Sequence, residues 1–443
     1  MAAKSKRQVY IKNIDMDYSS QDNKRASLNK RRRKSKFKSR LFTAIIAVAI
    51  IRWRLPLFKN LSSQSSLSNI FNIAREDVSV TVNDPKNLLN DEIKDIIMDY
   101  GLRYGKTLKS LSPEDIGNLY YDKDCRQALI NNTAFKTLAG IRKMSSLDLK
   151  LEYVSLQYNV KSAVSEGDKL TITILEDNVQ KFKHLKKESL TKNSIHYFVM
   201  IKDGGKWKLE SHTQEEDYYL LVLQAWDKSP YDMTDKEKAE NVLKVLLDDA
   251  EENYEINYTY QNNNNIPTGK YSYNRSRAIK YAEKYWDQRN WTDGYNAYDD
   301  YGGNCQNFCS QSIKAGGMKM DYTGSPGAQW KWYGDYLNEE PTASGRSSSW
   351  TGVDAFYNYA TSPYSQELVC AAGVSLKLAE KGDVLQLGAY GEWRHSVLVI
   401  DVIKNLDGSV KDIIIASNTA DRWNYPASAY VYTAQRLIHI LGQ

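Results

Sequence analysis

The alternation of apolar and polar positions predicts helices first and strands afterwards in the first half of the folded sequence. Residues 83–109 begin with Asn-Asp-Pro and carry apolar side chains at helical spacing, and Ser112 has the position of an N-cap for a second helix. From residue 147 the period changes to two, which predicts strands joined by Gly-containing turns. Helices followed by a meander of hairpins are typical of an α+β domain, which we place at residues 81–228.

A helix and a polar linker follow at residues 229–269. Thr234 and Glu237 have capping-box spacing ahead of a helix with one apolar face, and the sequence QNNNNIPTG ends the segment. The remaining residues, 270–443, open with a helical pattern in YSYNRSRAIKYAEKYW. They also contain SVLVIDVI, which is apolar on both faces and is typical of a central strand. This pattern predicts a second α+β domain.

The N-terminal residues divide into a basic tail at 1–40, an apolar segment at 41–58 and a Ser-rich and Asn-rich spacer at 59–80. The apolar core LFTAIIAVAII spans only about 17 Å as a helix, against about 30 Å of hydrocarbon, whereas the whole segment to Phe58 spans about 27 Å. We expect a membrane anchor here or the apolar part of a signal segment, although no convincing cleavage site follows. The basic residues before it predict a cytoplasmic N-terminus and folded domains outside the cell.

Composition and charge narrow the class of protein. The chain has 443 residues, of which 42% are hydrophobic and 26% charged, as in globular proteins of about three domains. Its net charge of +6 comes mostly from ten Lys and Arg between residues 24 and 40. That run is also compatible with a solvated tail or a nuclear address. Because the excess charge lies outside the folded parts, we expect no nucleic-acid partner.

The stretch GGNCQNFCSQSIKAGG carries the first candidate for chemistry. Its Gly-Gly pair permits a sharp turn, Cys305 follows at the start of a helix, and Cys309 lies one turn further on. A helix N-terminus favours a thiolate by only about 0.3 to 1 kcal/mol. Lowering a thiol pKa from about 8.5 to about 5 takes roughly 5 kcal/mol, so a nucleophilic Cys305 needs a cationic partner, usually histidine.

Two histidines are available in the last domain. His439 lies four residues from the end of the chain and has the pattern of a filler in a terminal strand. His395 stands at the start of the buried strand, where packing holds it as a general base must be held. A third polar residue should orient the imidazole, and Asn418 at the end of the next strand is favoured over Asp421.

The sequence gives less support to other roles for the cysteines. A Cys305–Cys309 disulfide within one helix has poor geometry, and Cys-x3-Cys lacks a second pair of zinc ligands nearby. Cys125 and Cys370 are isolated and are interpreted as buried fillers. We therefore expect neither a metal site nor a cofactor.

Four blocks in the last domain carry a resemblance to a known family. NRSRAIKYAEKYW, NAYDDYGGNCQNFCSQSIKAGG, GDV with HSVLVID, and SNTADRWNYP resemble, over residues 271–440, the amidase domain six group of Gram-positive bacteria. That group is related to the papain-like NlpC/P60 and CHAP cell-wall hydrolases. The resemblance implies a papain-like cysteine hydrolase fold, with the family's cysteine at Cys305 and its histidine at His395. Asn418 falls where many members have histidine, and Asn304 replaces the commoner Asp.

The first α+β domain has a less specific resemblance. The order of its elements and the hairpin FVMIKDGGKWKLESH are similar to NTF2-like (cystatin-like) domains. In that family such a domain is often a non-catalytic binding or spacing module. His184, His196 and His212 show no catalytic spacing, so we expect them to be solvated or structural.

Further residues are candidates for contacts with substrate. The backbone N–H of Cys305 can stabilise an oxyanion, and Tyr298 is the side-chain candidate by analogy with an upstream tyrosine in related hydrolases. Gln306 is a second candidate. Trp393 is two residues from His395 on the same side of the strand and can line a cleft.

These patterns together predict a membrane-anchored or exported thiol amidase or peptidase. The resemblance implies that it cleaves an amide in bacterial peptidoglycan, with peptidoglycan or a peptide as substrate and the membrane contacted through residues 41–58. The alternatives are a non-catalytic cell-wall binding module and an acyl transferase that uses the same thiol. The expected location is the cell membrane of a Gram-positive bacterium, with the folded domains extracellular, or the medium.

Overall fold

The computed structural model describes residues 77–259, 264–299, 303–323, 328–332, 346–365 and 367–443. The predicted basic tail and anchor, and the spacer up to residue 76, lie outside the described residues. Within the described ranges, none of the helices combines the length and apolar character needed to span a bilayer.

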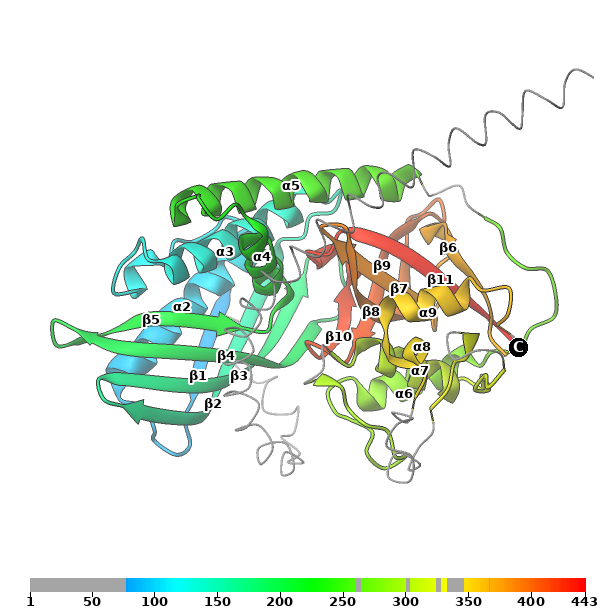
Figure 1. Cartoon of the computed structure of the whole chain (residues 1–443), viewed down its shortest axis with the longest axis horizontal. Coiled ribbons are helices and arrows are strands. Elements are labelled where there is room, and N and C mark those ends of the chain that lie inside the picture. The colour runs from blue at the N-terminus through cyan, green and yellow to red at the C-terminus, as the bar shows by residue number, and fades with distance from the viewer. Residues whose placement is uncertain (1–76, 260–263, 300–302, 324–327, 333–345, 366) are drawn as a thin grey trace, which may run out of the picture. The chain divides into compact units, whose positions relative to one another are not determined.

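The first part of the fold, here called the N-terminal region (residues 78–228), packs helices against a largely antiparallel sheet (Figure 1). Its elements are β1 (Val78–Asn83), α2 (Asp91–Ser110), η3 (Gly117–Leu119), α3 (Arg126–Met144), β2 (Leu151–Glu166), β3 (Lys169–Phe182), β4 (Ser189–Asp203), β5 (Lys206–Gln214) and α4 (Asp217–Lys228). Strands β2 to β5 pair antiparallel in chain order, and β1 lies parallel to β2. The predicted α+β class is confirmed.

Two predicted helix starts are wrong. The first helix, α2, begins at Asp91 with Asn90 as its N-cap, whereas the cap-like Asn83 is the last residue of β1.

Ser112 does not open a helix, because side chains accept hydrogen bonds from the N–H groups that follow it. The N–H of Glu114 donates to Thr107 Oγ1 at 3.0 Å, and the N–H of Ile116 donates to Asn132 Oδ1 at 2.9 Å. Such local acceptors offer the backbone an alternative to helical hydrogen bonds, and the segment stays non-helical until η3.

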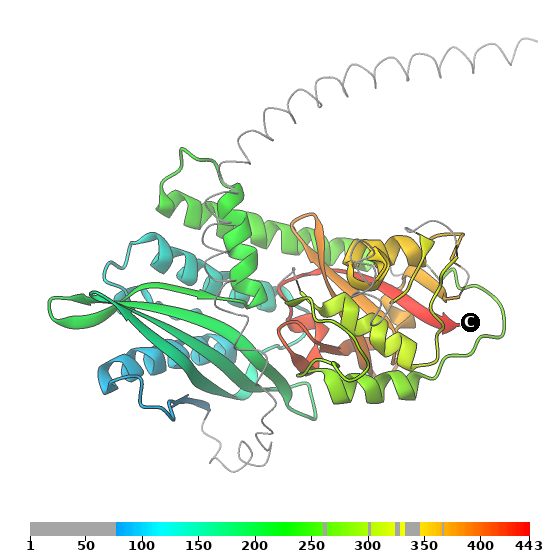
Figure 2. The same cartoon turned by 60° about the horizontal axis from the view of Figure 1, so that its bottom comes forward.

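The second part, here called the C-terminal region (residues 270–443), is preceded by α5 (Asp235–Thr259). Its elements are α6 (Arg275–Tyr285), α7 (Cys305–Ala315), α8 (Ser348–Thr351), α9 (Val353–Ala360), β6 (Val369–Val374), η8 (Leu376–Leu378), β7 (Val384–Ala389), β8 (Glu392–Lys404), β9 (Val410–Ser417), β10 (Arg422–Pro426), η9 (Ala427–Ala429) and β11 (Ala434–Gly442). Helices α7 and α9 pack on β8, and α5 packs against α3, α4 and β11 (Figure 2). Thr234 and Glu237 form the predicted capping box.

The strands of the two regions form one sheet, in the order β1-β2-β3-β4-β10-β9-β8-β7-β11-β6. The two regions join where β10 pairs antiparallel with β4, through Arg422 with Thr191 and Trp423 with Leu190. In the centre of the C-terminal region, residues 395–400 of β8 are all buried, as expected for a central strand. The order of strands places β10, the neighbour of β9, directly against the N-terminal region.

Candidate active site

The thiol of Cys305 lies at the first residue of α7, and the turn before it requires a glycine. Gly303 has φ of +112°, in the region that favours glycine, and a Cβ built there would lie 3.2 Å from Thr419 Oγ1. Asn304 is the N-cap residue, and its N–H donates to the same Thr419 Oγ1 at 2.7 Å. The hydroxyl of Thr419 therefore holds the residue that precedes the thiol.

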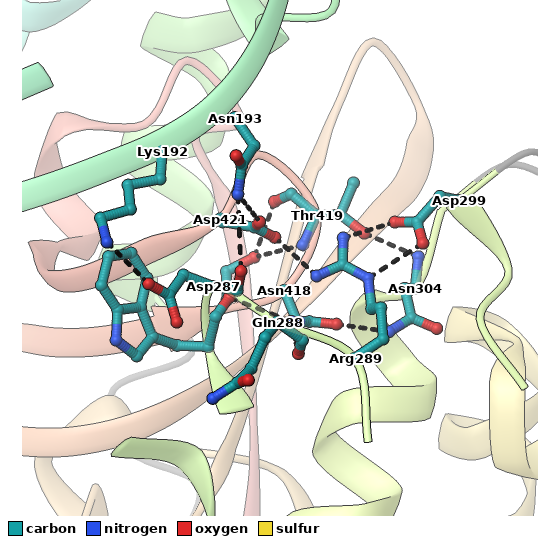
Figure 3. A network of polar contacts seen from close by, with 12 residues as sticks. Lys192, Asn193, Asp287, Gln288, Arg289, Asp299, Asn304, Asn418, Thr419 and Asp421 are labelled. Atoms are coloured by element: carbon teal, nitrogen blue, oxygen red, sulfur yellow. Dashed lines mark hydrogen bonds and ion pairs between the residues drawn. The ribbon is translucent and has the colours of Figure 1, made fainter. Parts of the chain in front are cut away.

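The Asn304 side chain is the centre of a buried polar network (Figure 3). Its amide nitrogen donates to Asn418 Oδ1, and its amide oxygen accepts from Asn307 Nδ2 at 2.7 Å and from the N–H of Tyr298 at 3.2 Å. The side chains of Asn304 and Asn418 are 3% and 1% exposed. Because each contact is made out of water, the network fixes the start of α7 tightly.

Asn418 uses its remaining hydrogen-bonding capacity on the loop after α6 rather than on the imidazole. Its Nδ2 donates to the carbonyl oxygens of Tyr285, Trp286 and Gln288 at 2.7, 3.0 and 3.1 Å. Among the described residues none of its hydrogen bonds is with His395. The structure thus places Asn418 as the link between the end of α6 and the start of α7.

The imidazole of His395 contacts Ser417 instead, with Nε2 3.0 Å from Ser417 Oγ. The Ser417 hydroxyl donates to the carbonyl of Thr419 at 2.9 Å. A hydroxyl has one proton, so Ser417 Oγ accepts from the imidazole, and Nε2 carries the hydrogen. Nδ1 then holds the lone pair that a general base needs.

Sequence reasoning missed Ser417, because the face of the sheet that a residue shares with His395 depends on how β9 is placed beside β8. Ser417 and Asn418 are adjacent, so their side chains lie on opposite faces of the sheet. The antiparallel register of β8 and β9 puts Ser417 on the face that carries His395. The sequence alone does not give that register.

Helix α7, which begins at Cys305, packs on β8, the strand that carries His395. Burial raises the pKa of the Cys305 thiol, and the N–H groups of Ser396 and Gln306 oppose that rise. Burial also lowers the pKa of His395 to about 4. The sequence argument predicts a lowered thiol pKa, whereas in the structure burial favours the neutral forms of both groups.

Two of the other predicted residues face away from the imidazole. The carboxylate of Asp421 accepts hydrogen bonds from Arg289 Nη1 at 3.0 Å and from Asn193 Nδ2 at 2.9 Å (Figure 3). Burial raises the pKa of Asp421 to about 6, and Arg289 opposes the rise. Gln306 is fully buried, and its Nε2 donates to Ser310 Oγ at 3.2 Å, which places the amide in the core of the domain.

The aromatic candidates are held by cations. The guanidinium of Arg346 lies 4.9 Å from the ring of Tyr298, whose backbone also contacts the turn before α7. The guanidinium of Arg436 lies 4.1 Å from the ring of Trp393, which is partly buried. Tyr298 is thereby tied to the turn at Gly303, while Trp393 on β8 lies beside Arg436 of β11, on the far side of β7.

The remaining histidines and cysteines take part in other contacts. His439 pairs with Asp383 at 2.8 Å, and His196 contacts His212 at 3.0 Å inside the N-terminal region. All four cysteines are free, and Cys309 is fully buried in the core behind Cys305. In the part of the chain that the structure describes, no cluster of His, Cys, Asp and Glu has the arrangement of a metal site.

Comparison with known proteins bears on the C-terminal region (residues 270–443), which is called the amidase region from here on because of the family match that follows. Residues 272–441 match the family model described as "Putative amidase domain". This match supports the amidase-domain family. A stretch of 138 residues is 32% identical to the uncharacterized protein YhbB of Bacillus subtilis (strain 168) and covers 30% of this chain. The chain spans 39% of the length of that relative.

A solved structure titled as a putative scytalone dehydratase from Novosphingobium aromaticivorans is also similar in part. It covers 28% of this chain and 80% of its own, at 11% sequence identity and a TM-score of 0.20. A similarity at that level does not establish a common fold. The amidase-family match supports amidase activity and a hydrolase, and the NlpC/P60, CHAP and NTF2-like relations stay predictions.

Proposed function

We propose that the amidase region is a papain-like thiol hydrolase in which Cys305 is the nucleophile and His395 the general base. The observation that carries the proposal is the packing of α7, which begins at Cys305, on β8, the strand that holds the imidazole. The match of this region to an amidase family supports the reaction class. The ring tautomer inferred from Ser417 supports the role of the base.

The reaction begins from the neutral pair. As the sulfur attacks the amide carbonyl carbon, Nδ1 of His395 takes the thiol proton, and an oxyanion forms on the carbonyl oxygen. The backbone N–H of Cys305, at a helix N-terminus, and the hydroxyl of Tyr298 are the proposed donors to that oxyanion. Collapse breaks the C–N bond, and the imidazolium gives its proton to the leaving amine. A water molecule, deprotonated by the imidazole, then attacks the thioester and releases the acid and the thiol.

The proposed substrate is an amide of bacterial peptidoglycan, met outside the membrane. The basic run followed by residues 41–58 supports anchoring or export. The N-terminal region, proposed to be NTF2-like, then separates the anchor from the enzyme or binds the wall. The resemblance of the four sequence blocks to cell-wall hydrolases supports the choice of substrate.

The test uses the full chain in detergent, with purified peptidoglycan as substrate and released amine and carboxyl groups as readout. Cys305→Ala should abolish release, while Cys309→Ala, a matched removal of a buried thiol one turn away, should keep most of it. Equal activity in wild type and Cys305→Ala would falsify the assignment. Loss of activity in both variants with loss of fold would be seen by circular dichroism and would direct the test to Cys305→Ser.

One observation favours the alternatives, a binding module or an acyl transferase. Burial disfavours the thiolate of Cys305, so the resting thiol should react slowly with iodoacetamide near neutral pH. A binding module would retain peptidoglycan without releasing any group. An acyl transferase would form the thioester and give product only when an acceptor amine is added, which mass spectrometry of Cys305 distinguishes from hydrolysis.

A further inference from the structure

A buried ion cluster joins the two regions next to the candidate site. Arg422 on β10 is 4% exposed, and its guanidinium donates to Asp217 Oδ2 at 2.5 Å and to Glu216 Oε2 at 2.8 Å. Both carboxylates lie at the start of α4, in the N-terminal region. A buried arginine needs such partners, because an unpaired buried charge is strongly unfavourable. The amidase region alone does not supply these two carboxylates.

The cluster is separated from the imidazole by a single aromatic ring. The guanidinium of Arg422 lies 4.5 Å from the ring of Tyr430, and the ring of Tyr430 lies 5.6 Å from that of His395. Charges interact strongly over such distances in a poorly solvated interior. A cation placed there opposes proton uptake by the imidazole, which is the step that a general base performs.

The two carboxylates face different surroundings. Glu216 accepts a hydrogen bond from the Ser194 hydroxyl, and its charge acts on Tyr104 and Tyr218 in the N-terminal region. The charge of Asp217 acts on the other side of the contact between the two regions. It favours proton binding by His395, whereas the charge of Arg422 opposes that proton binding. The charge of Asp217 also raises the pKa of Cys305. The charged groups that act on the imidazole are Asp217 on α4 and Arg422 on β10, the ring of Tyr430 after η9 lies beside it, and Cys305 is on α7, which packs on β8.

We propose that Asp217 is a positioning residue of the Cys305–His395 site, where it offsets the charge of Arg422 and keeps the imidazole able to accept a proton. The proposal rests on the function proposed above. Under this proposal the N-terminal region contributes to catalysis, because Asp217 on its helix α4 influences the basicity of His395 in the amidase region. Glu216 then has the different role of holding Arg422 in place.

The test compares Asp217→Asn with Glu216→Gln in the full chain. Each change removes one carboxylate charge from the same guanidinium and keeps the size of the side chain. For Asp217→Asn we expect kcat/KM on its plateau to fall about threefold to tenfold, because a weaker base takes the thiol proton less readily. We also expect the acid limb of the pH profile to move to lower pH. Glu216→Gln should leave that limb in place.

A second readout requires no substrate. The rate of carbamidomethylation of Cys305 by iodoacetamide rises with pH, and its midpoint should move to lower pH in Asp217→Asn because the thiolate loses a neighbouring negative charge. The same variant therefore labels faster and turns over more slowly. A purely structural defect is not expected to move the acid limb of the pH–activity profile to lower pH. Asp217→Glu, which keeps the charge, should behave as wild type in both measurements.

The outcomes separate the two proposals. If activity depends on Cys305 but Asp217→Asn and Glu216→Gln give the same profiles and midpoints, the role of Asp217 is overturned and the hydrolase stands. If Cys305→Ala keeps full activity, the hydrolase is overturned, and the labelling midpoints alone report the effect of Asp217. If Asp217→Asn does not fold, Asp217→Glu decides, because loss of the wild-type profile there would refute a role for the charge.

Discussion

Replacement of Asn418 by Ala is the change that best separates a structural role from a catalytic one. The side chain is 1% exposed; its two amide N–H groups are shared among three carbonyl oxygens of residues 285–288, and its oxygen accepts one hydrogen bond from Asn304. With about 1 kcal/mol net for each of these three hydrogens, Asn418→Ala should lower the free energy of unfolding by about 3 kcal/mol. That loss is a large share of the roughly 5–15 kcal/mol by which a typical domain is stable.

The assay is urea unfolding followed by tryptophan fluorescence, with kcat/KM measured on the same preparations. Asn405→Ala is the matched control: Asn405 is exposed, donates to Ser409 Oγ at 2.9 Å, and should cost less than about 0.5 kcal/mol. The reasoning is refuted if Asn418→Ala keeps its stability within about 1 kcal/mol of wild type while kcat falls about a thousandfold. Such a result would indicate that Asn418 orients the imidazole of His395.

Three other measurements test the same geometry. Ser417→Ala removes the acceptor for His395 Nε2–H, and we expect kcat/KM to fall about tenfold to a hundredfold with a stability loss near 1 kcal/mol, measured as above. Burial lowers the pKa of His395 from 6.5 to about 4. The neutral imidazole therefore makes its full contribution to stability above pH 6.5, and about 3 kcal/mol of stability is lost as the pH falls toward 4. His395→Gln should flatten the pH dependence of the free energy of unfolding over that window. Gly303→Ala should lower the melting temperature more than Gly391→Ala. Both glycines have positive φ, but only at Gly303 would an added Cβ lie within 4 Å of another atom. Equal shifts in melting temperature would contradict the role of this close contact.

The local patterns of the sequence predicted the helix and the strand that carry the candidate residues. A Gly-Gly pair before a polar-apolar repeat indicates a helix that begins at Cys305, and the apolar run after His395 indicates a buried strand. Both signals depend on neighbours in the chain, and single-sequence reasoning handles those well. The capping box at Thr234 and Glu237 belongs to the same class.

The partners of the imidazole depend on long-range placement instead. Whether Ser417 or Asn418 faces His395 is decided by the register of β8 and β9, and the register shifts between Val399 and Asp401. Asp217 comes from another region of the chain altogether, 178 residues before His395 (395 minus 217). A single sequence contains no pattern that pairs residues over such separations, and the same is true of the thiol pKa, which burial raises.

The pairing of β4 with β10 has a practical consequence for anyone who divides the gene. Cutting the chain within residues 229–269 would leave each half with a strand whose N–H and C=O groups had lost their partner. Exposed strand edges of this kind recruit other copies of the same chain. Separately expressed halves should therefore tend to self-associate, and supplying both halves together should return them to solution as a pair.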